Sequence, residues 1–255
     1  MVLPEGLQSI GEGWFAQSRV ERVELSASVL EIEKGAFSRC GRLAELLIPA
    51  NSALAEVKPC AFEHCALRTL ELPGSVSRIG WGAFRGCPIE KLSFAEDCRL
   101  EELEPWTFTG AQLEEFTAPR TLRKIGEGAF WSCGNLQKVA LNEGLVEIGD
   151  EAFMRARVCK VLLPSTVRRL GDVALMNLTQ VTLAEGLQVV PAGLFQRVSV
   201  SKVVVPVSAT EVAPEAFRGC LELTDVVFAE GSRLERIGHN AFRESGLESF
   251  TAPST

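Results

Sequence analysis

The sequence LELPGSVSRIGWGAFRGC occupies residues 70–87 and contains every pattern that decides the fold. It begins with an apolar–polar–apolar segment (70–72) that is followed directly by Pro73. Such alternation is typical of a β-strand with one buried face, and proline ends the strand because it lacks the N–H that a ladder needs. A second extended segment (76–79) precedes a glycine that allows a tight turn. We therefore interpret this stretch as two short strands, with the Ala-Phe pair at 83–84 forming a corner.

The Ala-Phe corner, or a close variant of it, recurs along the whole chain. Its last residue returns every 20 to 25 positions, at Phe15, Phe37, Phe62, Phe84, Phe108, Phe130, Phe153, Leu175, Phe195, Phe217 and Phe242. The two strand patterns keep the same spacing. One such unit cannot bury its apolar face alone, but stacked copies build a continuous core and a parallel ladder. We expect the unit at 171–175, which is short and lacks phenylalanine, to form the weakest coil.

These units resemble the BspA-like leucine-rich repeats, also called the Treponema type. Their pattern is L-x-x-V-x-(I/L)-P-x-S-V-x-x-I-G-x-x-A-F-x-x-C, which residues 70–87 match nearly position by position. The resemblance covers almost all of the chain and implies a solenoid that binds proteins or surface ligands without catalytic residues. We expect a mainly β repeat solenoid: a right-handed leucine-rich-repeat-like superhelix of about 11 coils with a parallel sheet and short helical turns.

No linker or shift in composition divides the chain, so we expect one solenoid domain over residues 1–255. The chain begins partway through a unit and stops directly after a strand pattern that ends at Pro253. Isolated solenoids need polar caps at their ends. We therefore expect either a fragment with incomplete units at both ends or self-association end to end.

Composition limits the classes of partner and of chemistry. The 255 residues contain 26 Lys and Arg against 33 Asp and Glu, for a formal charge of −7, which argues against nucleic acid and anionic membrane. Two histidines and no tyrosine leave few acid–base groups. Neither a secretory signal nor an apolar stretch long enough to span a membrane is present, so we favour an intracellular, reducing location.

Two groups of residues suggest a metal or cofactor site at first sight. Gly11 and Gly13 fit a dinucleotide fingerprint, but that fingerprint requires a long helix, and here the same spacing recurs in phase with the repeat at Gly80/Gly82 and Gly126/Gly128. Five cysteines lie three residues after a corner Phe, in a position that small residues fill in other units: Cys40, Cys65, Cys87, Cys133 and Cys220. We expect them to be buried free thiols. We predict no cofactor and no metal, and we expect His64 and His239 to be exposed.

Binding residues are expected on the outward positions of the Leu-x-x-Val-x-Leu strands. In the C-terminal half, apolar residues and lysines occupy these positions side by side: Lys138, Ala140, Lys160, Leu162, Lys202, Val204 and Val227. An apolar row beside charges of one sign suggests contact with a partner that has acidic edges. The alternative is that β-branched residues are there because strands favour them.

The function that we predict is a non-enzymatic protein-binding scaffold that presents this outward face to a partner protein of unknown identity. The alternative is a segment of a cell-surface adhesin that binds extracellular matrix protein or glycan. An enzyme would need a clustered acid–base set, which the sequence does not suggest.

Overall fold

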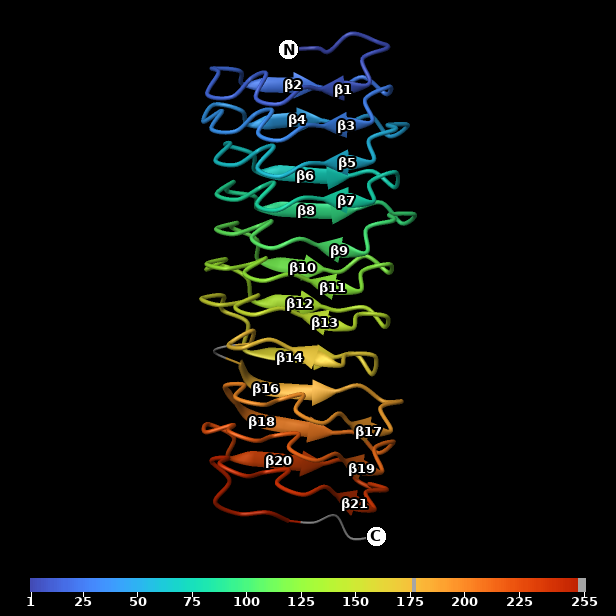
Figure 1. The fold of residues 1–255 in the computed structure, drawn as a ribbon, viewed down its shortest axis with the longest axis vertical. Helices are drawn as coiled ribbons and strands as arrows, with labels where there is room; N and C mark the ends of the chain where they lie inside the picture. The colour runs from blue at the N-terminus through green and yellow to red at the C-terminus, as the bar shows by residue number, and fades with distance from the viewer. Residues whose placement is uncertain (176–177, 252–255) are drawn as a thin grey trace.

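The computed structural model describes residues 1–175 and 178–251, which form one column of stacked coils (Figure 1). Each coil contributes a strand to each of two faces, and every pair of neighbouring strands is parallel. The Val-x-x-Ile segments form what we call the short-strand face, and the Leu-x-x-Val-x-Leu segments form the long-strand face. The predicted parallel β-solenoid is confirmed.

The two faces have the following strands. The short-strand face has β1 (Ser9–Ile10), β3 (Glu31–Ile32), β5 (Glu56–Val57), β7 (Arg78–Ile79), β9 (Glu102–Leu103), β11 (Lys124–Ile125), β13 (Glu147–Ile148), β15 (Arg169–Leu170), β17 (Val189–Val190), β19 (Glu211–Val212) and β21 (Arg236–Ile237). The long-strand face has β2 (Arg22–Glu24), β4 (Glu45–Leu47), β6 (Thr69–Leu72), β8 (Lys91–Phe94), β10 (Glu115–Thr117), β12 (Lys138–Ala140), β14 (Lys160–Leu163), β16 (Leu178–Leu183), β18 (Val200–Val205) and β20 (Asp225–Phe228). The expected last strand is not assigned in its described part, residues 247–251, and Pro253 lies outside the described residues.

Hydrogen-bonded ladders are continuous over different lengths on the two faces. On the short-strand face, β1 to β15 form one eight-stranded sheet, and β17, β19 and β21 form a second sheet. The long-strand face consists of three two-stranded sheets and the four-stranded sheet β14-β16-β18-β20. The regular sheet that we expected over the whole long-strand face is therefore restricted to its C-terminal half.

The corner phenylalanines lie in single file inside the column. From Phe15 to Phe153, the centroids of successive rings are 5.1 to 5.8 Å apart, and the ring planes agree within 20°. Beyond Leu175 the rings stack again, and the ring centroids of Phe195 and Phe217 are 4.9 Å apart. Most of these rings are fully buried, so the core is one aromatic and aliphatic column.

The corners are not helical, which corrects the expected short helical turns: no helix is assigned to any described residue. The residues two before and two after the corner Phe have positive φ, for example Cys60 at 56° and His64 at 56° around Phe62. The N–H groups of these three residues donate to carbonyls of the next coil at 2.7 to 2.9 Å, whereas Ala61 and Glu63 donate within their own turn. A helix needs consecutive right-handed residues, so this alternation excludes one.

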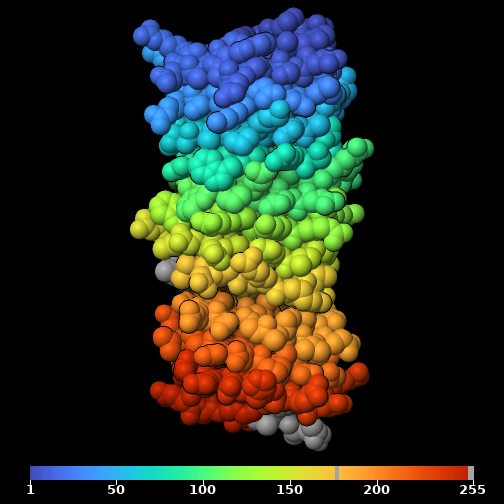
Figure 2. Space-filling model, viewed as in Figure 1, coloured from blue at the N-terminus to red at the C-terminus, as the bar shows by residue number. Residues whose placement is uncertain are grey.

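The coil that lacks its phenylalanine is also the one at which the short-strand ladder stops. No bridge joins β15 to β17 among the described residues. In neighbouring coils Gly171 and Ala213 donate a ladder N–H at 2.7 and 3.0 Å, but Pro191 occupies the matching position and has no N–H. A groove of about 360 Å³ separates the two coils beside Val189, and Figure 2 shows the gold and orange bands parting along this line.

Candidate functional site

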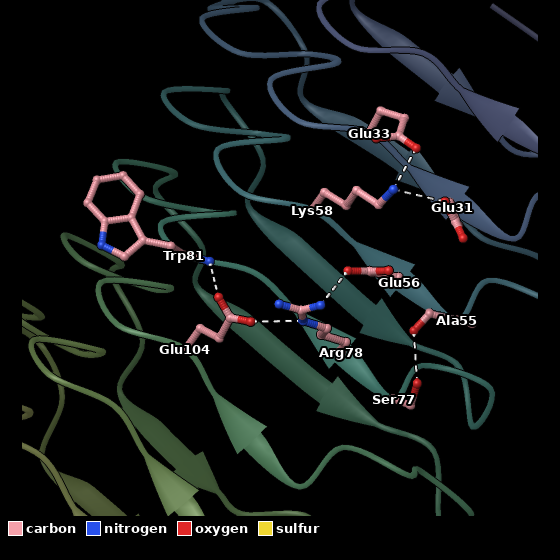
Figure 3. A network of polar contacts seen from close by, with 9 residues as sticks. All are labelled: Glu31, Glu33, Ala55, Glu56, Lys58, Ser77, Arg78, Trp81 and Glu104. Carbon is pink, nitrogen blue, oxygen red and sulfur yellow. Dashed lines mark hydrogen bonds and ion pairs between the residues drawn. The ribbon is translucent and has the colours of Figure 1, made fainter.

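The outer surface of the short-strand face is a ladder of ion pairs. Lys58 Nζ lies 2.6 Å from a Glu33 carboxylate oxygen and 3.0 Å from Glu31. Arg78 contacts Glu56 at 3.2 Å and Glu104 at 3.0 Å (Figure 3). The hydrogen bonds to Glu33 and Glu31 raise the pKa of Lys58, and those from Lys58 lower the pKa of Glu31.

The pairing continues where residues of opposite sign face each other in register on neighbouring strands. Three further pairs span 2.6 to 3.1 Å: Lys124–Glu102, Arg169–Glu147 and Arg236–Glu211. Opposite charges directly across a strand pair stabilise one register and disfavour a slipped one. These charges are already matched within the chain, so this face offers little electrostatic attraction to a partner.

The long-strand face has a different outer surface in its C-terminal half. Leu162, Thr182, Val204 and Val227 follow one another in register across β14, β16, β18 and β20. Leu162 is 57% exposed and Val227 is 39% exposed. Together with exposed Ala140 on β12, the three hydrophobic members of this line form what we call the apolar row. The structure thus brings Leu162, Val204 and Val227 together, and Thr182 interrupts the row.

Lysines border the apolar row on one side. Lys138, Lys160 and Lys202 each lie two residues before a member of the row, on the same outward side of the strand, and we call them the lysine row. Lys138 and Lys160 are exposed and Lys202 is half-buried. None of the three is within 4.0 Å of a carboxylate of any described residue, in contrast to Arg22, which pairs with Glu45 at 3.6 Å at the other end of this face.

A groove lies between β12 and β14, where the ladder on this face is interrupted. Its volume is about 440 Å³, and its lining consists of Gln137, Lys138, Val139, Arg157, Cys159 and Lys160. The strand pattern predicted the two lysines as outward residues, but not Arg157 and Cys159, which precede the strand β14. Both are exposed.

The repeated cysteines form a buried column rather than a site. Each thiol of the column donates to the carbonyl of the corner Phe in the preceding coil at 2.7 to 3.3 Å, as Cys87 does to Phe62. Burial raises the pKa of Cys133 and of Cys220 to about 12. All eight cysteines are free. Within residues 1–175 and 178–251, no cluster of three or more His, Cys, Asp or Glu side chains is placed to hold a metal ion.

The remaining candidates from the sequence are parts of turns. Gly13 has a φ of 65° and occupies the corner position that is left-handed in every coil described, so the glycine fingerprint is repeat geometry. His64 and His239 are exposed, as expected, and lie in different coils. The described part of the chain has no helix whose length and apolarity would take it across a bilayer.

Comparison with known proteins identifies the repeat. A family model described as the BspA-type leucine-rich repeat region matches in six copies, over residues 1–88, 55–177 and 160–255. A leucine-rich repeat protein from Bacteroides ovatus shares the fold, with a TM-score of 0.60 and 23% identity over 93% of this chain and 68% of its own. The pneumococcal vaccine antigen PcpA is 21% identical over 91% of this chain and 71% of its own, with a TM-score of 0.49. No curated protein matches the chain.

Proposed function

We propose that this chain, which belongs to the BspA-type leucine-rich repeat family, is a non-enzymatic scaffold that binds a partner protein. The binding surface is the outward side of β12, β14, β16, β18 and β20. Leucine-rich repeat solenoids typically serve as protein-interaction scaffolds, because stacked strands present a broad, stiff surface.

One observation carries the proposal: the apolar row and the unpaired lysine row lie side by side. Burial of Leu162, Val204 and Val227 against a partner would remove apolar surface from water, at about 25 cal/mol per Å². Lysines at the edge of such a contact select a partner with acidic groups and speed its association. On the short-strand face, by contrast, the lysines and arginines of the ladder are paired within the chain, and exposed Val189 is next to Glu211 in register.

The absence of an assembled acid–base set supports a role in binding rather than in catalysis. In the described residues the two histidines are exposed in separate coils, and the thiols of the cysteine column are buried donors to backbone carbonyls. The alternative of a surface adhesin that binds matrix protein or glycan stays a prediction from the sequence.

The test compares charge substitutions on the two faces. A partner recovered by affinity capture and then purified is titrated against the wild type, Leu162→Asp and Val204→Asp. Val189→Asp is the matched control, since Val189 is an apolar residue on the short-strand face with 38% exposure. A buried, unpaired carboxylate in the interface should weaken binding by at least about tenfold.

Circular dichroism and thermal unfolding verify that each variant is folded. We expect Val189→Asp to bind as the wild type does. Full affinity in folded Leu162→Asp and Val204→Asp would remove this face from consideration.

A further inference from the structure

The groove between β12 and β14 exists because two neighbouring strands are not paired. β12 pairs with β10 and β14 pairs with β16, but no ladder joins β12 to β14 in the described residues. The Arg157 N–H still donates to the Leu136 carbonyl at 3.0 Å, so the coils stay in contact at the base of the groove. The groove opens outward, between side chains at the first positions of the two strands.

Three cations surround this groove: Lys138, Arg157 and Lys160. All three are exposed, and none forms an ion pair with a carboxylate of the described chain. Glu115 is the neighbour of Lys138 in register on β10, yet the two side chains are not within 4.0 Å. In a chain of net charge −7, three unmatched cations around one groove mark a local site for negative charge.

This inference rests on the proposed function and specifies its partner: we propose that the groove binds carboxylate side chains of an extended acidic segment of the partner polypeptide. On one side of an extended strand, side chains recur every second residue, about 6.6 Å apart. Lys160 and Leu162 have the same spacing on β14. A segment lying along β14 therefore presents an acidic residue to Lys160 and Arg157 and an apolar residue, two positions later, to Leu162.

Two features favour a polypeptide over a small anion or a nucleic acid. Lys138 and Lys160 of the groove each lie two residues before a member of the apolar row, which a free phosphate or a nucleic acid backbone would leave uncovered. The strongly acidic remainder of the chain repels a polyanion as large as nucleic acid. The favoured sequence in the partner is thus acidic–any–apolar, repeated along an extended segment.

Cys159 provides a direct probe of occupancy. It lines the groove and is exposed, whereas six of the other thiols are buried and Cys60 is half-buried. In a Cys60→Ser background, iodoacetamide should therefore alkylate Cys159 first, and a segment bound in the groove should shield it. The rate is followed by mass spectrometry, and protection is the ratio of rates without and with the probe.

The probes are the synthetic peptide ESLSESLSES, its lysine counterpart KSLSKSLSKS, and inorganic phosphate, each at about 1 mM, the range of weak binding. We expect the acidic peptide to slow alkylation several-fold at about 50 mM salt and much less at about 500 mM, because screening weakens exposed ion pairs. The basic peptide and phosphate should leave the rate unchanged. The double variant Lys138→Glu/Lys160→Glu should lose the protection.

The inference is overturned if the acidic peptide gives no protection, if both peptides protect equally, or if phosphate alone protects. Its failure can be told apart from failure of the proposed function. Partner binding that is lost in Leu162→Asp but kept in Lys138→Glu/Lys160→Glu would retain the proposed face and reject the acidic segment. Protection by the acidic peptide, together with unchanged partner affinity in Leu162→Asp, would retain the groove and reject the face.

Discussion

At the residue scale, the cysteines that lie three residues after a corner Phe both fill space and connect neighbouring coils. The sequence predicted a small, buried filler, and the burial of Cys40, Cys65, Cys87, Cys133 and Cys220 is confirmed. The structure adds that each thiol is a hydrogen-bond donor to the preceding coil. The corner carbonyl already accepts a backbone N–H in its own coil, as Phe62 does from Cys65, and the thiol adds a second donor that alanine in the same position cannot provide.

The raised pKa values of Cys133 and Cys220 predict a loss of stability in alkali. The pKa of Cys133 and Cys220 is about 12 in the folded chain, against an ordinary value of 9.0. Above pH 9 the unfolded chain loses these protons while the folded chain keeps them, so stability is full below pH 9 and is lost between pH 9 and 12. Each thiol contributes a slope of up to about 1.4 kcal/mol per pH unit.

Urea unfolding at pH 8 and at pH 10.5 measures this loss. The variant Cys133→Ser/Cys220→Ser keeps a donor at each position but does not ionise in this range, so its stability should fall less between the two pH values. Equal losses in the variant and the wild type would show that these thiols do not control alkaline stability.

The positions of the corner residues were readable from the sequence, but their backbone conformation was not. The spacing of phenylalanines placed all of the stacked rings. Glycine at the left-handed positions was a recognisable signal only in some coils, since Cys60, His64 and even the β-branched Val173, with a φ of 49°, adopt positive φ elsewhere. Local preference opposes that conformation. At Cys60 and His64 this conformation directs the N–H to a carbonyl of the next coil, so it depends on the stack as a whole.

At the scale of elements, the two faces differ in how far their ladders continue. The sequence predicted both strands of each coil and the direction of their outward side chains. It did not predict where pairing stops, because the gap between β12 and β14 coincides with no departure from the strand pattern. The stop between β15 and β17 coincides with Pro191, which lacks one of the N–H donors that neighbouring coils use there, as Gly171 does.

Replacing Pro191 should therefore repair the short-strand ladder. Pro191→Ala supplies an N–H that can donate to the carbonyl of Leu170, as Gly171 donates to Ile148 in the coil before. We expect slower amide hydrogen exchange over residues 186–193. The added hydrogen bond contributes about 1 kcal/mol to the free energy of unfolding, and the greater freedom of the unfolded chain offsets part of it. Hydrogen exchange with mass spectrometry and urea unfolding measure the two effects.

Pro214→Ala is the matched control for this change. Pro214 lies one position later in its own coil, where no ladder donor is needed, so alanine only releases the unfolded chain and should destabilise slightly. If Pro191→Ala leaves exchange unchanged and is no more stable than Pro214→Ala, the missing N–H at Pro191 is not the reason why the ladder stops.

At the scale of the whole molecule, the stack turns a repeated unit into a surface with distinct regions. Ion pairs cover the short-strand face, whereas the apolar row and the lysine row share the C-terminal half of the long-strand face. The sequence predicted the two rows because their positions follow from strand alternation. The groove beside them could not be predicted from the sequence, because it depends on the distance between two coils.

Lysine footprinting of the complex with a purified partner shows which face of the solenoid the partner covers. Acetylation by an amine-reactive ester, measured residue by residue with mass spectrometry, compares the free and bound chain. We predict that Lys138, Lys160 and Lys202 become protected, while Lys91 on the N-terminal half of the same face and Lys124 on the opposite face keep their reactivity. Protection of Lys91 or Lys124, with Lys138, Lys160 and Lys202 still reactive, would contradict the assignment of the binding face.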